Sequence, residues 1–368
     1  MKAQFSFIIT LFLIVSCQRN TFEEVKINKV ITFNYECEES ISKDIDSVAY
    51  FPLESNPMAL FSNSSKVVFR DDKIFIGDFF LHKIVVYSNA GQFLYALNSR
   101  GRATNEYLEI KNFCVTDHEI AIIDNFNHFL KMYDVETGHF LENKTMPIVA
   151  WDVEWLDNGG YVFAFSPLLK KYNPNKLRYR LFFTDGDLNI TKKLFPYKEN
   201  EIDPLGKMTY FSLSKEGIVF HWYGANYFSV IDRVESDSIK IVAVDFGDKE
   251  IPDEYKGNME KINQGGYYYM GETPVVNANY IAFEISNPNS SDCYLYSIND
   301  DMMKRNYEDE SMGMPFPLCV DEQGRFIYLL NSFGEYEVLV NHGFPRASKE
   351  VEAHIKDDGL TILRYVTK

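Results

Sequence analysis

The sequence predicts an all-β fold, a six-bladed β-propeller with four-stranded blades, and three observations lead to it. Residues 73–98 and 119–145 repeat one another. The repeated pairs, 46 or 47 residues apart, are Asp78 and Asp124, His82 and His128, Tyr87 and Tyr133, and Gly91 and Gly138. A period of this length with strand-like patterning is typical of one propeller blade. Further groups of four short strands follow this repeat. The aromatic share of 15% is high, and strands favour aromatic residues.

The first residues resemble a bacterial export signal. Lys2 precedes an apolar run from Phe5 to Val15, which is shorter than the about 20 residues that a membrane span needs but suits a signal peptide. Ser16 and Cys17 follow directly, and a small residue before a cysteine resembles the lipoprotein cleavage box. We therefore expect a signal peptide over residues 1–16 and lipidation of Cys17, which would anchor the chain by lipid alone. An ordinary secretory signal is the alternative.

These features predict a cell-envelope address. Gln18 is not the aspartate associated with inner-membrane retention, so the resemblance to lipoproteins favours the outer membrane. Periplasmic and surface-facing orientations both stay open. The formal charge of -16 and the pI near 4.9 argue against nucleic acid or anionic lipid as partners, because both require basic patches. The four other cysteines show no CxxC spacing, so neither zinc nor a redox pair is predicted.

The chain divides into a lipid anchor, tether and entry segment over residues 17–47 and a six-bladed propeller over residues 48–368. From residue 66 the strands can be counted in fours. The expected strands are 66–70, 73–78, 83–87 and 92–98 in blade one; 110–115, 119–124, 129–134 and 139–145 in blade two; 150–156, 161–165, 178–184 and 188–195 in blade three; 208–214, 218–222, 227–232 and 238–246 in blade four; and 274–278, 280–285, 292–297 and 302–307 in blade five.

The sixth blade has three strands of its own, at 317–320, 325–330 and from Leu360 to Val366. The strand from Val48 to Leu53, which precedes blade one, has no other place. We expect it to pair with the C-terminal strand and complete blade six. Such closure removes the exposed sheet edge that an open ring would present to other chains.

At this point the chain resembles a known family. The stretches Asp78-x-x-x-His82-Lys83 and Asp124-x-x-Asn127-His128 are similar to degenerate NHL repeats. The mature chain resembles the six-bladed β-propeller lipoproteins of the Bacteroides group, including at residues 50–54 and 101–107, although residues 103–105 replace that family's glycine-proline-glycine turn. The resemblance implies architecture and says little about activity.

The repeated polar residues have a structural interpretation. Asp78 and Asp124 end a strand before a tight turn, where an aspartate usually accepts hydrogen bonds from turn amides. Because His82 and His128 recur with the same period, we interpret them as contacts between blades and not as reactive histidines.

Two carboxylates are the only candidates for chemistry on the axis. Asp152 and Glu154 share one face of an expected innermost strand, where they could hold calcium or act as acid and base. The alternative is that they are solvated groups along a wet channel. No Ser/His/Asp motif, glycine-rich phosphate loop or HExxH helix occurs, so we predict no catalytic residue and no resident cofactor.

Loop lengths carry the main functional prediction. In a four-stranded meander, second-to-third turns and blade crossings share one face, and nearly all the long connections fall there, with helices expected at 253–264 and at 348–356 before Gly359. Long ordered loops on one end of a rigid scaffold are where binding sites accumulate. The predicted ligand-binding residues on this face are Arg100, Arg102, Lys170, Lys171, Tyr172, Tyr267, Tyr268 and Tyr269.

Three functions are consistent with these patterns. The first is a non-catalytic binding or scaffolding module for an envelope glycan, peptide or protein. The second is a propeller hydrolase or lyase with a metal, such as calcium, on the axis. The third is a structural subunit of an outer-membrane complex, which would present an apolar patch in place of a polar pocket.

Overall fold

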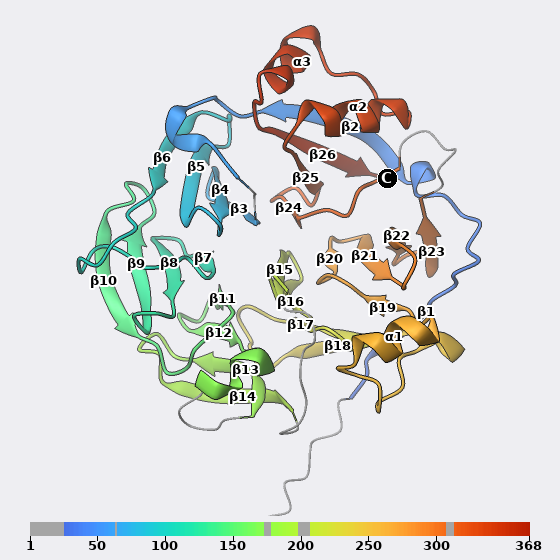
Figure 1. Ribbon diagram of the computed structural model, residues 1–368, viewed down its shortest axis with the longest axis horizontal. Coiled ribbons are helices and arrows are strands. Elements are labelled where there is room, and N and C mark those ends of the chain that lie inside the picture. The colour runs from blue at the N-terminus through green and yellow to red at the C-terminus, as the bar shows by residue number, and fades with distance from the viewer. Residues whose placement is uncertain (1–25, 63–64, 173–177, 198–206, 307–312) are drawn as a thin grey trace, which may run out of the picture.

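Six β-sheets surround a central axis in the computed structural model (Figure 1), which confirms the predicted six-bladed β-propeller. The structure describes residues 26–62, 65–172, 178–197, 207–306 and 313–368. The predicted signal peptide and Cys17 lie outside these described residues. In the part of the chain that is described, no helix is long and apolar enough to cross a membrane.

Each blade is an antiparallel meander that begins at the axis and ends at the rim. The first three blades consist of β3 (Lys66–Arg70), β4 (Lys73–Asp78), β5 (Lys83–Ser88) and β6 (Phe93–Leu97); β7 (Phe113–Val115), β8 (Glu119–Asp124), β9 (Phe129–Asp134) and β10 (Phe140–Thr145); and β11 (Asp152–Trp155), β12 (Tyr161–Ala164), β13 (Tyr179–Thr184) and β14 (Ile190–Pro196).

The innermost strand of blade five is interrupted, so that two short strands pair with β21. The last three blades consist of β15 (Phe211–Ser214), β16 (Gly217–Phe220), β17 (Tyr227–Ile231) and β18 (Ile239–Asp245); β19 (Tyr269–Met270), β20 (Val275–Val276), β21 (Tyr280–Ser286), β22 (Ser291–Ser297) and β23 (Met302–Arg305); and β24 (Cys319–Val320), β25 (Phe326–Leu330), β26 (Thr361–Thr367) and β2 (Ile45–Pro52).

Burial explains why the inner strands read as continuous apolar runs. Ile74, Phe75 and Ile76 in β4 are all fully buried, because both faces of a blade pack against neighbouring blades. The outermost strands face solvent on one side, and β10 accordingly contains mostly exposed or half-buried residues. The hydrophobic effect of burying both faces therefore holds the ring together blade against blade.

The ring closes as predicted. β2 pairs antiparallel with β26, with Val48 opposite Tyr365 and Phe51 opposite Ile362. Immediately after β2, Leu53 N donates a hydrogen bond of 2.9 Å to Leu360 O. Pro52, which has no backbone N–H, is tolerated because β2 is the edge strand of its sheet. The first and last parts of the propeller domain thus share one sheet.

The N-terminal entry segment joins a blade that the sequence did not predict for it. β1 (Lys29–Thr32) pairs in parallel with β18 as a fifth, outermost strand of blade four. The chain then reaches blade five, where Arg305 N donates to Glu39 O at 3.0 Å, before it enters blade six as β2. We call residues 28–44 the N-terminal belt. It binds the rims of blades four, five and six together (Figure 1).

All the long connections join strands at one end of the blades, as predicted. The longest connection at the opposite end spans only residues 232–238 between β17 and β18. At the other end lie the blade crossings and the second-to-third turns, including 246–268 before β19 and 331–360 before β26. We call this end the loop face.

Three α-helices lie in the long connections. α1 (Met259–Gly265) begins later than the predicted 253–264, after the N-cap residue Asn258. α3 (Lys349–Lys356) agrees with the predicted 348–356: Ser348 Oγ accepts a hydrogen bond from Val351 N at its start, and Asp357 is its C-cap residue. The sequence did not predict α2 (Phe333–Asn341). The 3-10 helices are η1 (Ile41–Lys43), η2 (Pro57–Ala59), η3 (Pro167–Tyr172) and η4 (Gly247–Lys249).

The two helices of blade six cover its outer part and not the axis (Figure 1). Tyr336 of α2 and Ile355 of α3 are buried in one core cluster with Tyr365 of β26. The longest insertion on the loop face therefore stabilises the closing blade, and the region around the axis stays accessible.

Candidate functional site

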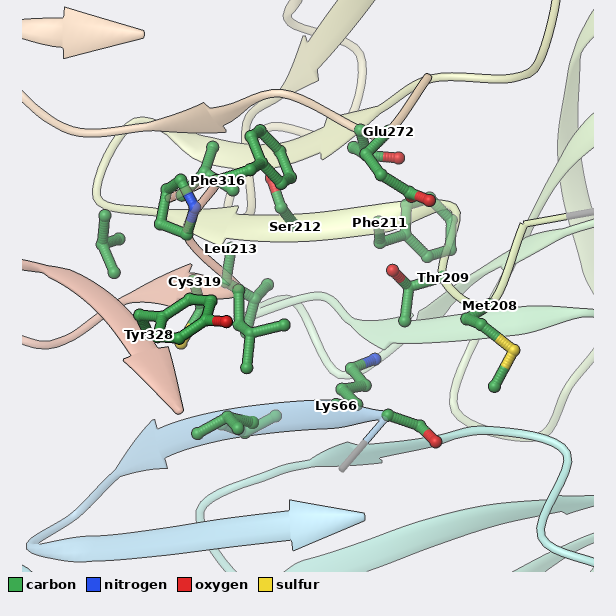
Figure 2. Close-up of a pocket in the computed structure, with 18 of the residues that line it drawn as sticks. Lys66, Met208, Thr209, Phe211, Ser212, Leu213, Glu272, Phe316, Cys319 and Tyr328 are labelled. Carbon is green, nitrogen blue, oxygen red and sulfur yellow. The ribbon is translucent and has the colours of Figure 1, made fainter. Parts of the chain in front are cut away.

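A cavity of about 500 Å³ lies on the axis of the ring. Its wall consists of the innermost strands of blades one, four, five and six, with Glu154 from blade three, and of residues that immediately precede those strands. Figure 2 shows side chains from these blades around one shared space. Met208, which precedes β15, lines the cavity and is 52% exposed, so the cavity opens toward the loop face.

The lining combines apolar and polar groups. Phe211, Leu213, Phe316 and Tyr328 provide apolar surface, and hydroxyl groups come from residues such as Ser212. A cavity of a few hundred Å³ with apolar walls and a few polar groups is typical of a small-molecule site or of a pocket for a partner's side chain.

Two carboxylates give the cavity its charge. Glu272 precedes β20 and Glu284 lies in β21, and both line the cavity. Ser291 Oγ donates to Glu284 Oε1 at 3.0 Å. Among the described residues, no cation lies within ion-pair distance of either carboxylate. Burial raises the pKa of Glu272, an effect that the charge of Lys207 opposes and that of Glu284 reinforces.

Sequence reasoning missed both glutamates. They lie in blade five, the least regular blade, and are separated by the break between two short strands and a turn. Glu272 lies outside a strand and a turn separates it from Glu284, so no strand period relates the two and only the fold brings them to one cavity. The acidic composition was the one available hint, and it does not distinguish these glutamates from the others.

The predicted axial carboxylates are not solvated, and of the two only Glu154 lines the cavity. Lys66 Nζ lies 2.6 Å from Glu154 Oε1 and 3.3 Å from Asp152 Oδ1, and all three side chains are buried. The same ammonium donates to Phe113 O at 2.9 Å and to Asn112 Oδ1 at 3.2 Å. We call Lys66, Asn112, Asp152 and Glu154 the axial cluster.

The axial cluster connects four blades. Lys66 belongs to blade one, Asn112 precedes blade two, and the carboxylates belong to blade three. Asp152 Oδ2 also accepts hydrogen bonds from Tyr210 N and Phe211 N, at the start of blade four. The position where the sequence suggested calcium thus holds an ammonium group, and within the described residues no group of three or more potential ligand residues could hold a metal ion.

Charge within the axial cluster is unbalanced, because two carboxylates share one ammonium. Burial raises the pKa of Asp152 and of Glu154, and the positive charge of Lys66 only partly opposes that effect. For Lys66, burial lowers the pKa, but the two carboxylates outweigh it and raise the pKa above its ordinary value.

A second buried basic group lies close to the cavity. Lys207 Nζ is 2.6 Å from Nδ1 of His221, and Nε2 of the same imidazole is 3.1 Å from Ala225 O. Burial, followed by the charges of Lys207 and Arg180, lowers the pKa of His221 well below its usual value. His221 is therefore neutral, accepting from Lys207 and donating to Ala225 O. The sequence did not identify this pair.

The repeated aspartates lie in the tight turns of the loop face. Asp78 Oδ1 accepts from Phe80 N at 3.0 Å and Leu81 N at 2.8 Å. Asp124 Oδ2 accepts from Leu108 N at 3.0 Å, on the crossing between blades one and two. In both cases the carboxylate accepts hydrogen bonds from backbone N–H groups and so stabilises the local backbone.

The repeated histidines end the same turns in the left-handed backbone conformation, with φ of 53° at His82 and 58° at His128. His82 Nδ1 accepts from Ile110 N at 3.2 Å. That bond joins blade one to the crossing that precedes blade two.

The predicted loop-face residues do not form one site. Arg100 and Arg102 are exposed on the crossing after blade one. Lys170, Lys171 and Tyr172 fall in η3, and their side chains lie outside the described residues. None of the five residues whose side chains the structure describes lines the axial cavity.

The three tyrosines are half-buried and pack on nearby aromatic rings. Tyr267 lies 6.2 Å from Tyr255, and Tyr269 lies 5.2 Å from Tyr223, measured between ring centroids. Tyr268 contacts Phe33 and Tyr35 of the N-terminal belt.

Comparison with known proteins identifies the family. A family model described as a domain of unknown function, DUF4934, matches residues 27–362. The chain belongs to this family. Among solved structures, the DUF4934 chain is similar to a protein of Bacteroides fragilis named a "putative exported protein", with a TM-score of 0.77 and 15% identity over 92% of this chain and 100% of that chain.

Another match is a DUF4221 family member from Bacteroides vulgatus, with a TM-score of 0.47 and 12% identity over 88% of this chain and 97% of that one. Among curated proteins, none matches the DUF4934 chain. The likeness to the Bacteroides fragilis protein supports the resemblance to Bacteroides six-bladed propellers and concerns the fold alone.

Proposed function

We propose that this DUF4934 protein is a lipid-anchored cell-envelope propeller that binds a glycan, peptide or envelope protein without catalysis, at the loop-face end of its axis. The observation that carries the proposal is the axial cavity, with Glu272 and Glu284 in its wall and no cation of the described residues paired with either. Such a site favours a ligand that offers positive charge or hydrogen-bond donors.

The sequence supports the envelope address, through the apolar run and the Ser16-Cys17 pair. The structural likeness to a protein named as exported is consistent with it. Lys66 supports a non-catalytic role, because its ammonium already occupies the position between the two axial carboxylates. The belt joins the propeller at the rim of blade four, so a tether attached there leaves the mouth of the cavity accessible.

Thermal unfolding with candidate ligands tests the binding proposal. The panel contains amine-bearing and neutral oligosaccharides, cationic peptides and calcium. A ligand present at 100 times its Kd stabilises the folded state by about 2.7 kcal/mol. We expect an amine-bearing or cationic ligand to raise the unfolding midpoint by a corresponding amount. The rise in midpoint should be lost in the Glu272→Gln/Glu284→Gln double variant. It should be retained in Glu337→Gln, which changes an exposed glutamate of α2.

Two outcomes would contradict this proposal. One is a ligand-induced rise in the unfolding midpoint that persists in the double variant, which would place the ligand elsewhere. The other is a rise with calcium that a chelator reverses, which would favour the hydrolase or lyase alternative with an axial metal.

Lipid anchoring has its own test. We expect Cys17→Ala to move the protein from the membrane fraction to the soluble fraction, because one residue carries the whole proposed attachment. Fractionation followed by immunoblotting measures this, with Cys37→Ala, a buried cysteine of the belt, as the matched control. Membrane partitioning that persists in Cys17→Ala would exclude the lipid anchor.

A further inference from the structure

Three neighbouring blades expose an apolar side chain at the same place in their second-to-third turns. Phe80 is 81% exposed, Phe126 is 71% exposed and Leu168 is 42% exposed. Phe80 and Phe126 lie two positions after Asp78 and Asp124, the last residues of β4 and β8, and Leu168, in η3, lies two positions after Ser166. The turn bonds of blades one and three correspond: Phe80 N donates to Asp78 Oδ1, and Leu168 N donates to Ser166 Oγ. We call Phe80, Phe126 and Leu168 the apolar arc.

The fold does not require these side chains. A turn held by a carboxylate needs that carboxylate, and polar or small residues are preferred around it. An exposed phenyl ring adds almost nothing to the hydrophobic core. Phe79 illustrates the contrast, because it is buried with its ring 6.3 Å from that of Phe113. Exposed apolar side chains gathered on one face mark interaction sites.

The turns that carry the arc are held firmly by their neighbours. Tyr107 OH donates to His82 O at 2.9 Å, and so joins the crossing after blade one to the turn that holds Phe80. Asn125 Nδ2 donates to Ala150 O at 2.8 Å, and so joins the turn of Phe126 to the crossing after blade two. The backbone that carries Phe80 and Phe126 is therefore fixed before binding, which lowers the entropic cost of binding there.

Positive charge lies beside the arc. Arg100 Nε donates to Leu108 O at 3.2 Å, and Leu108 N in turn donates to Asp124 of the blade-two turn. Arg102 is two positions further along the same exposed crossing. Neither arginine lies within 4 Å of a carboxylate in the part of the chain that the structure describes, although the protein carries a formal charge of -16.

We propose that the apolar arc and the Arg100–Arg102 pair dock a protein partner through a segment with an apolar face flanked by carboxylates. Charge complementarity selects this occupant. A second copy would bring the same arginines against each other. A neutral glycan needs hydrogen-bonding groups, and the three arc side chains have none. This inference goes beyond the axial cavity, because no residue of the arc lines it.

Two designed peptides test the docking surface. Both are amphipathic helices of about 18 residues, long enough to be helical alone, with leucines along one face and either glutamate or lysine beside them. Fluorescence anisotropy measures their binding to the mature protein. We expect the glutamate peptide to bind at least tenfold more tightly than the lysine peptide. In Phe80→Ser/Phe126→Ser its Kd should rise at least tenfold, and in Arg100→Glu/Arg102→Glu the preference should reverse.

The matched control is Leu94→Ser/Leu141→Ser, which removes two exposed leucines, 42% and 47% exposed, from the outer strands of the same two blades. It should leave peptide binding unchanged. The proposal is overturned if the two peptides bind equally, if the control weakens binding as much as the arc variant, or if vesicles of anionic phospholipid compete with the glutamate peptide. Circular dichroism and the unfolding midpoint of each variant exclude misfolding as the cause of a loss, and failure here leaves the cavity test unaffected.

Discussion

Replacing Lys66 with methionine is expected to lower the free energy of unfolding by about 3–5 kcal/mol, because Asp152 and Glu154 would stay buried without their cation. Methionine keeps most of the side-chain volume, so a packing defect adds little. The loss should be large because the lysine also donates to Asn112 and to Phe113 O, which belong to blade two. Denaturant unfolding measured by circular dichroism gives the difference.

Two further variants show that charge is the cause. Lys215→Met changes an exposed lysine in the turn between β15 and β16 and should alter stability by no more than about 0.5 kcal/mol. Adding Glu154→Gln to Lys66→Met should restore part of the loss, because it removes one unpaired buried charge. If Lys66→Met costs no more than Lys215→Met, the axial cluster does not contribute as argued.

Removing β2 should abolish cooperative folding. A chain that begins at residue 54 leaves β26 as an open edge of blade six and exposes the apolar surface that β2 covers. We expect a loss of the sharp thermal transition and aggregation through the free edge, because unpaired strands recruit other chains. Differential scanning calorimetry and size-exclusion chromatography measure both effects.

A chain that begins at residue 34 provides the comparison. It lacks β1 but keeps β2, so the ring still closes. Buried Ile31 and Phe33 are lost, and this should lower the midpoint without removing cooperativity, since blade four keeps its four own strands. Similar behaviour of the two truncated chains would show that closure by β2 is not what completes the fold.

The candidate site was predictable only in part. Asp152 and Glu154 could be placed on one face of an inner strand, because strand alternation puts alternate residues on the same side. The sequence could not predict that both carboxylates bind Lys66. The lysine precedes them by more than 80 residues and contacts them only because the first three blades curve around the axis. Charged side chains are also rarely buried, so a prediction from sequence places them in contact with solvent.

The sequence pattern by itself determined the architecture. A closed ring with its long connections at one end follows from the repeat around Asp78 and Asp124, from the groups of four apolar strands and from the remaining strand at Val48. Tertiary structure decided which side chains meet. Glu272 and Glu284 enter one cavity, and Phe80, Phe126 and Leu168 stand on one face, because ring geometry sets these distances. Strand periodicity reports the environment of each residue along its own strand and carries no information about the partner that another blade supplies.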